Sequence, residues 1–132
     1  MNPMINVDGL VTPMADATIP AMDRGFLYGD SVYEVFRTYK GVPVFMDDHF
    51  ERLENSASLI SMTITQSREE LIQEIRRTVK ATGAGSEQDI YVRYQVTRGV
   101  GPVDLYPDPD LTTRDVIIVS TQIGRASGRE RV

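Results

Sequence analysis

Arginine and tyrosine recur along the chain at spacings that could bind an anion. Tyr91 and Arg93 alternate with apolar residues, and so do Tyr33 and Arg37. Because successive side chains of a strand point to opposite faces, each pair shares one face of its strand. If both strands lie in one sheet, the pairs form a basic, phenolic wall able to bind a carboxylate. The alternatives are a polar sheet face in solvent and a mixed face packed under another element.

Two further candidates lie outside these strands. Arg52 follows His49 near the start of an expected helix, where a guanidinium can clamp a phosphate with help from local backbone dipoles. Tyr28 lies between Gly25 and Gly29, and glycine lets a backbone approach a ligand closely. A solvated surface arginine and an ordinary turn are the alternatives. His49 fits a structural or supporting role better than that of a base.

The composition excludes several kinds of site. The chain has no cysteine and one histidine, so disulfides, thiol catalysis and cysteine zinc sites are excluded, and no metal is expected. A net charge of −5 argues against nucleic-acid binding. The N-terminus lacks a signal-peptide pattern and no apolar run could span a membrane, so we expect a cytoplasmic protein. The two lysines, Lys40 and Lys80, are unattractive nucleophiles in a turn and on a helix surface.

Alternating and apolar sequence patterns predict several β-strands. The expected strands are a hairpin at 4–12 around Asp8-Gly9, then 31–39, 42–46, 89–97 and 116–120. Residues 13–30 are expected to be irregular because proline and glycine interrupt them. Neither face of the 31–39 strand is purely polar, so we expect both faces to be covered.

Two helices complete the prediction. The first begins with Asp48 as N-cap and Glu51 completing a capping box. Its buried stripe is Phe50, Leu53, Ala57 and Ile60. The second begins at Ser67 with Glu70, ends near Gly83 and buries Leu71, Ile72, Ile75 and Val79. The fold class expected is therefore α+β, a mostly antiparallel sheet with two helices packed on it.

The last ten residues follow a different pattern. Residues 123–132 contain three arginines, little hydrophobic pattern and no turn or cap signal, and they resemble a translated sequencing-library adapter. We expect a non-native tail there and one domain at 1–122. A genuine basic tail is the alternative. An apolar strand directly before the tail suggests that the natural chain continues further.

Three motifs in order resemble the small N-terminal domain of fold-type IV pyridoxal-phosphate enzymes, the class IV aminotransferases. They are Asp23-Arg-Gly-Phe-Leu-Tyr-Gly-Asp-Ser-Val-Tyr-Glu-Val35 with Arg37, His49-Phe-Glu-Arg52-Leu-Glu-Asn-Ser-Ala57, and Tyr91-Val-Arg93 leading to Thr97-Arg-Gly99. The resemblance covers residues 3–121. It implies a two-domain, typically homodimeric enzyme that binds pyridoxal 5′-phosphate. The large C-terminal domain, with the Schiff-base lysine, would lie beyond this chain, which should be inactive alone.

The resemblance also implies residue roles. Arg52 would bind the cofactor phosphate. The expected substrate-binding residues are Tyr28, Tyr33, Arg37, Tyr91 and Arg93. The substrates implied are an amino acid and a 2-oxo acid, exchanged by transamination.

The sequence features that indicate the substrate do not all agree. Tyr33-Glu34-Val35 is closer to D-amino-acid transaminases, whereas branched-chain members often have Phe-Glu-Gly. The Arg-x-His carboxylate trap of the D-specific enzymes is missing, because the corresponding loop reads Pro-Val-Asp-Leu at 102–105. Tyr91 and Arg93 favour a branched-chain L-amino acid. The alternatives are a D-amino-acid transaminase, an aminodeoxychorismate lyase, and a non-catalytic domain that binds an anion or a partner.

Overall fold

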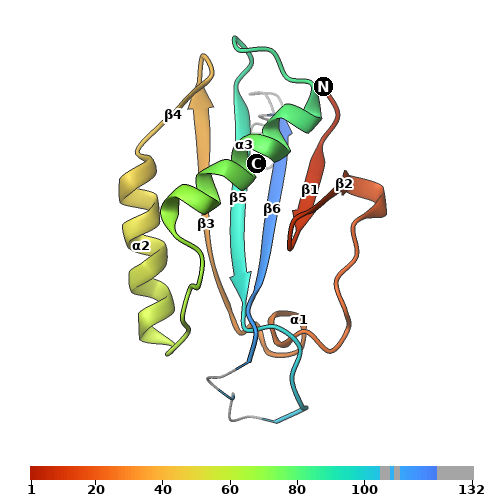
Figure 1. Cartoon of the computed structure of the whole chain (residues 1–132), viewed down its shortest axis with the longest axis vertical. Helices are drawn as coiled ribbons and strands as arrows, with labels where there is room; N and C mark the ends of the chain where they lie inside the picture. The colour runs from red at the N-terminus through yellow and green to blue at the C-terminus, as the bar shows by residue number, and fades with distance from the viewer. Residues whose placement is uncertain (105–107, 109–110, 122–132) are drawn as a thin grey trace, which may run out of the picture.

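A six-stranded antiparallel sheet organises the computed structural model, which describes residues 1–104, 108 and 111–121. Its strands are β1 (Met4–Val7), β2 (Leu10–Pro13), β3 (Ser31–Tyr39), β4 (Val42–Pro43), β5 (Ile90–Thr97) and β6 (Arg114–Thr121). Their order is β2-β1-β6-β5-β3-β4 (Figure 1). The predicted tail at 123–132 lies outside the described residues.

Both long helices pack on the same face of this sheet. They are α2 (Met46–Leu59), which lies along β3, and α3 (Arg68–Thr82), which crosses the strands in front of the sheet in Figure 1. A short α1 (Arg24–Tyr28) lies at one end of the sheet, and a 3-10 turn, η1, spans Met14–Asp16. The predicted α+β class and the antiparallel sheet are confirmed.

Strand alternation builds the core beneath the helices. Val92 and Val96 on β5 are fully buried, and Phe36 on β3 is nearly so. They pack with Leu53 of α2 and Ile75 of α3. Each such side chain contributes about 1.5–3 kcal/mol when it leaves water, so this face holds the sheet and helices together.

The opposite sheet face is open. Tyr33 and Val35 on β3 are 53% and 40% exposed, and no helix among the described residues lies over them. We call this the open face. The expectation that both faces of β3 are covered is therefore wrong for the described part of the chain.

The start of α2 also differs from the prediction. The helix begins at Met46, and its N-cap is Phe45 in a left-handed conformation (φ 57°) without a side-chain cap hydrogen bond. Asp48 is not the N-cap, because the chain leaves the short β4 and turns sharply at Phe45; it lies instead in the first turn, where its charge complements the helix dipole. Ile60 ends the helix and is 37% exposed, so it does not extend the buried stripe.

Other boundaries follow local chemistry. Residues 24–28 form a helix despite their glycine, because the Asp23 side chain accepts a hydrogen bond from the Gly25 backbone at 2.7 Å. Gly29 closes α1 in the left-handed region. For α3 the predicted start is confirmed, since Ser67 and Glu70 make both hydrogen bonds of a capping box. Of its predicted buried residues, Leu71 and Ile75 are buried, whereas Ile72 and Val79 are partly buried.

Candidate functional site

The predicted wall forms on the open face. Strands β3 and β5 pair so that Arg37 lies opposite Tyr91 and Val35 lies opposite Arg93. The guanidinium carbon of Arg93 lies 3.9 Å from the centroid of the Tyr33 ring. The structure thus brings Tyr33, Arg37, Tyr91 and Arg93 together on one surface, as strand parity predicts.

Hydrogen bonds orient one half of this wall. Arg93 Nη2 donates to Gln95 Oε1 at 3.3 Å, and Gln95 Nε2 donates to Ser31 Oγ at 3.0 Å. The Tyr33 ring excludes water from one side of the Arg93 guanidinium, and the hydrogen bond to Gln95 orients it. In the described part of the chain Arg37 makes no ion pair, so its charge is available to an anion.

A pocket of about 320 Å³ lies at the Arg37 end of the wall. It is lined by Val35, Phe36, Arg37, Val44, Phe45, His49 and Tyr91. His49 comes from the first turn of α2, so the pocket joins the helix to the wall at the edge of β3. Its mixture of apolar walls with a cation, a phenol and an imidazole suits a small anionic ligand.

Arg52 lies on the other side of β3 from the wall. Its Nε donates to Glu34 Oε1 and Oε2 at 2.9 and 3.0 Å, and its Nη2 donates to Oε1 at 2.6 Å. His49 Nδ1 lies 2.7 Å from the same Oε1. Glu34 has the opposite strand parity to Tyr33, so the structure does not place Arg52 with the four wall residues.

The charged groups of this cluster favour one another's ionised forms. Burial pushes the pKa of the Glu34 carboxyl upward, but hydrogen bonds from Arg52 and His49 outweigh it and hold the pKa below its ordinary 4.5. Glu34 in turn raises the pKa of the Arg52 guanidinium. The cluster is therefore an ionised carboxylate that fixes a permanent cation.

Arg52 fits the phosphate end of a cofactor in chemistry and exposure. Its side chain is 67% exposed, and Nη1 has no hydrogen-bond partner among the described residues. A guanidinium held through Nε and Nη2, with one free terminal nitrogen, suits binding of a phosphate oxygen. Lys40 and Lys80 do not line the pocket that contains Arg37 and Tyr91.

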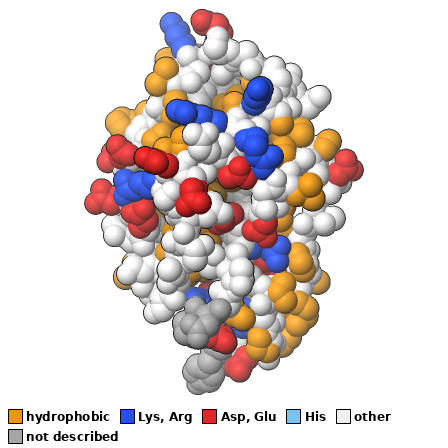
Figure 2. Space-filling model, viewed as in Figure 1, with side chains coloured by type: hydrophobic (Ala, Val, Ile, Leu, Met, Phe, Trp, Pro, Cys, Tyr) orange, Lys and Arg blue, Asp and Glu red, His pale blue; other side chains and the backbone are white. Residues whose placement is uncertain are grey.

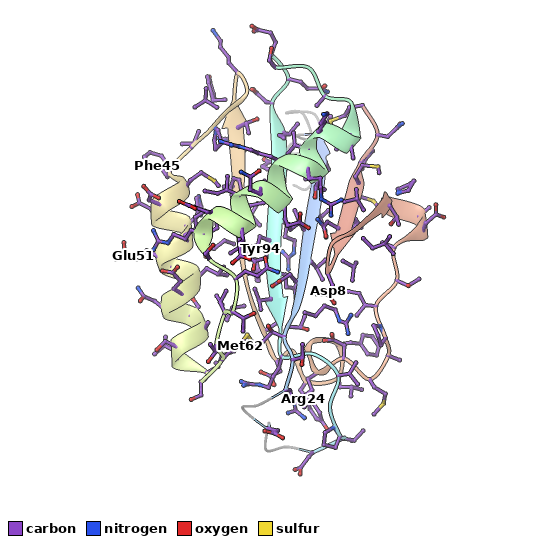
Figure 3. All side chains as sticks on the ribbon, viewed as in Figure 1. Asp8, Arg24, Phe45, Glu51, Met62 and Tyr94 are labelled. Carbon is purple, nitrogen blue, oxygen red and sulfur yellow. The ribbon has the colours of Figure 1, made fainter. Side chains whose placement is uncertain are left out.

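Tyr28 belongs to a separate cluster at α1. The Arg24 guanidinium carbon lies 4.5 Å from the Tyr28 ring centroid, and Arg24 Nε bonds Asp30 Oδ2 at 3.0 Å. Figure 3 shows Arg24 and Phe45 toward opposite ends of the molecule. The structure therefore separates Tyr28 from the pocket beside Phe45.

The sequence analysis did not predict the buried ion pairs around α1. Arg24 and Arg98 are 2% and 3% exposed, and both bind Asp30. Arg24 Nη1 also donates to the carbonyls of Pro102 and Asp104. The sequence signals available were Asp-Arg-Gly at 23–25 and Thr-Arg-Gly at 97–99, because an arginine among loop residues has five donors and is the residue best suited to a buried ion pair.

Neither a metal site nor a membrane span emerges from the described residues. They contain no group of three or more acidic or histidine side chains able to hold a metal ion. None of the helices in the described ranges is long and apolar enough to cross a bilayer.

Comparisons with known proteins agree with the motifs. A family model described as amino-transferase class IV matches residues 31–132. A putative branched-chain-amino-acid aminotransferase of Methanocaldococcus jannaschii is 36% identical over 103 residues, which are 78% of this chain and 35% of that protein. An aminodeoxychorismate lyase of Bacillus subtilis is 33% identical over 97 residues, or 74% of this chain and 33% of that protein. A D-alanine aminotransferase of Staphylococcus haemolyticus is 34% identical over 106 residues, or 80% and 36%.

Solved structures show the same fold. The branched-chain amino acid aminotransferase from Escherichia coli superposes with a TM-score of 0.81 at 23% identity, over 92% of this chain and 42% of that one. A second branched-chain amino acid aminotransferase, from T.th. and solved with pyridoxamine 5′-phosphate, has a TM-score of 0.78 at 25% identity, over 92% and 41%. The chain thus spans 33–36% of the length of the curated relatives above.

Proposed function

The chain belongs to the class IV aminotransferase family, and from this premise we propose that it is the small domain of a pyridoxal-phosphate-dependent aminotransferase. The enzyme would move an amino group between a branched-chain L-amino acid and a 2-oxo acid. The observation that carries the proposal is the shared wall of Tyr33, Arg37, Tyr91 and Arg93 on the open face. Two guanidinium groups and two phenols on adjacent strands suit a substrate carboxylate.

Each group has a defined task in this proposal. Pyridoxal phosphate, when bound, would supply the electron sink of the reaction. Arg52 would hold the cofactor phosphate, while Glu34 and His49 keep its guanidinium in place. Arg37 and Arg93 bind carboxylate oxygens, with Tyr91 donating a further hydrogen bond. Tyr33 lines the space for the substrate side chain.

Two parts of the enzyme would come from elsewhere. The lysine that binds the cofactor and moves the Cα proton belongs to a C-terminal domain, which would cover the open face. A second copy of the whole protein is the other expected partner, and the expected compartment is the cytoplasm. The chain by itself should be inactive.

Substrate choice rests on finer features. The loop at 102–105 lacks the Arg-x-His trap, and a branched-chain relative is 36% identical, so a branched-chain L-amino acid is favoured. Tyr33-Glu34-Val35 and a D-alanine aminotransferase at 34% identity support the D-amino-acid alternative. An aminodeoxychorismate lyase at 33% identity supports the lyase alternative. Resemblance to the branched-chain members assigns Tyr28 to the substrate carboxylates, although within one copy of the chain Arg24 holds it away from the pocket that contains Arg37.

The test restores the downstream reading frame and assays the complete protein. We expect 2-oxo acid formation from L-leucine, L-isoleucine and L-valine, and none from the 132-residue chain. Activity with D-alanine alone would identify a D-amino-acid transaminase, and pyruvate release from aminodeoxychorismate would identify a lyase. A downstream sequence without a large domain and its lysine would reject all three enzymes and leave the binding-domain alternative.

The proposed role of Arg52 in binding the cofactor phosphate is tested in the same complete protein. Arg52→Ala should weaken cofactor binding by roughly 10- to 100-fold, because a charge-assisted bond to phosphate is lost. Arg68→Ala is the matched control, since Arg68 is also a helix-surface arginine paired with a glutamate, Glu54, outside the pocket. Spectroscopic titration with pyridoxal phosphate measures both. Equal affinities for Arg52→Ala and the control would remove Arg52 from the site.

A further inference from the structure

A second pocket lies on the helix-covered face of the sheet. It has a volume of about 350 Å³ and is enclosed by α3, the β3–β4 hairpin and the loop at 83–89. Gly41 of the hairpin turn lies close against Ser86. A Cβ at Gly41 would come within 2.3 Å of the Ser86 carbonyl oxygen. The hairpin and the loop therefore meet and close one end of the pocket. None of the four wall residues lines it.

The floor of this pocket is apolar and rigid. Phe36, Ile75 and Val92 line it, and they are only 5%, 5% and 0% exposed. Val79 adds a further aliphatic surface from α3. These residues belong to the core, so the floor is preformed and does not require a change in packing to accept an apolar group.

The rim is cationic. Arg76 and Lys80 line the pocket from positions four apart on α3, which places them on one side of the helix. Within the described residues neither makes an ion pair, whereas the neighbouring Arg77 pairs with Glu74 at 3.0 Å. Among the described residues no acidic side chain lines the pocket, although the chain carries a net charge of −5. Figure 2 shows Lys and Arg side chains beside hydrophobic ones on the upper half of the α3 side.

A buried hydroxyl adds a directional group. Thr38 lines the pocket, is 7% exposed, and accepts a hydrogen bond from the Ile90 backbone at 3.1 Å. Its hydroxyl still carries a proton that can be donated to a ligand oxygen in the pocket.

We propose that this pocket binds a small carboxylate with an aliphatic body. The apolar floor buries the hydrocarbon part, Arg76 and Lys80 bind the carboxylate, and Thr38 donates to an oxygen. The volume lies at the lower end of the usual range of about 300–1,000 Å³ for ligand pockets, which suits a short acid and excludes a long lipid chain. This site is separate from the wall, and the two pockets share only Phe36.

The test is titration of the 132-residue chain with sodium hexanoate, followed by two-dimensional ¹H–¹⁵N NMR. We expect saturable shifts at Ile75, Val79 and Val92, and at least roughly tenfold weaker binding of 1-hexanol, which has the same body without the charge. The double variant Arg76→Gln with Lys80→Gln should weaken hexanoate binding by about tenfold or more.

Arg68→Gln is the control for the charge. Arg68 also lies on α3, does not line the pocket and is about 12 Å from Arg76 along the helix axis. Its replacement should change hexanoate affinity by less than about twofold, because its charge is paired with Glu54 and lies about a Debye length from the site. Equal weakening by both variants would show nonspecific attraction, and equal binding of hexanoate and hexanol would show a purely apolar groove. Either result, or absence of saturable shifts, overturns the proposal. If Lys80 only offsets the dipole of the α3 C-terminus, its loss lowers stability and leaves affinity unchanged, which overturns the proposal as well.

Discussion

At the scale of single residues, Glu34 organises more of the candidate site than its place in a strand suggests. It is nearly buried, yet it accepts hydrogen bonds from Arg52 and lies 2.7 Å from His49. Removing it would leave an arginine without orientation and an imidazole without its partner. Glu34 is therefore a positioning residue in the proposed enzyme, because it acts on the cofactor phosphate only through Arg52.

The pKa of Glu34 gives a prediction for Glu34→Gln. Its folded pKa lies below the ordinary 4.5, so its contribution to stability is complete above that value and disappears as pH falls through the folded pKa. Glu34→Gln should lower the free energy of unfolding by about 1–2 kcal/mol near neutral pH and by much less in acid below the folded pKa. Urea unfolding at both pH values measures this.

Glu54→Gln is the control for that experiment. Glu54 also pairs with an arginine that lowers its pKa, but it is half-exposed and solvent screens the pair. Its replacement should cost clearly less near neutral pH. Equal costs for the two substitutions, or a pH-independent cost for Glu34→Gln, would show that the Glu34 cluster is no stronger than a surface pair.

Strand parity predicted the wall residues because alternation is a local property of the backbone. Tyr33 and Arg37 on β3, and Tyr91 and Arg93 on β5, follow from counting by two. The bond from Arg98 to Asp30 was beyond such counting, since the partners are 68 positions apart. The pairing of Arg52 with Glu34 was also missed, because the contact depends on how α2 lies against β3.

At the scale of elements, the connections decide where helices begin and how loops pack. A capping box predicted the start of α3, since Ser67 and Glu70 lie close in sequence. The similar pattern of Asp48 and Glu51 misplaced the start of α2, because the helix begins after Phe45, whose left-handed conformation is not part of a capping box. Local sequence signals therefore predicted one helix start correctly and placed the other too late.

Gly99 gives a prediction about the loop after β5. It has φ +88°, and a Cβ there would lie 1.9 Å from the Thr112 carbonyl oxygen. Its own carbonyl accepts a hydrogen bond from the Arg24 backbone at 2.8 Å. Gly99→Ala should therefore cost at least about 3 kcal/mol, from left-handed strain and backbone displacement together. Urea unfolding measures the loss.

Gly83→Ala separates these two causes. Gly83 has φ +75° at the end of α3, but a Cβ there would meet no atom within 4 Å. Its replacement should cost about 1 kcal/mol from backbone strain alone. If Gly99→Ala is no worse than Gly83→Ala, the close approach of Gly99 to Thr112 does not constrain the loop.

At the scale of the whole molecule, the two sheet faces have different roles. One face carries the core and both long helices, and it holds the fold together. The open face carries the four wall residues with exposed apolar neighbours such as Val35. A ligand wall is of most use when a second layer covers it and excludes water, because charged hydrogen bonds strengthen in a drier site. In the proposed enzyme the C-terminal domain provides that layer.

Without that layer, the open face should make the 132-residue chain associate with itself. Val35 lies in the middle of β3, 40% exposed and directly opposite Arg93. Val35→Glu should reduce association, since it places a charge on an apolar surface and can pair with Arg93 across the strands. Leu59→Glu is the control, because Leu59 is 86% exposed at the end of α2, away from the open face. Sedimentation velocity over a range of concentrations distinguishes them: Val35→Glu alone should shift the chain toward monomer. A wild-type chain that stays monomeric at all concentrations, or an equal effect of both substitutions, would contradict an adhesive open face.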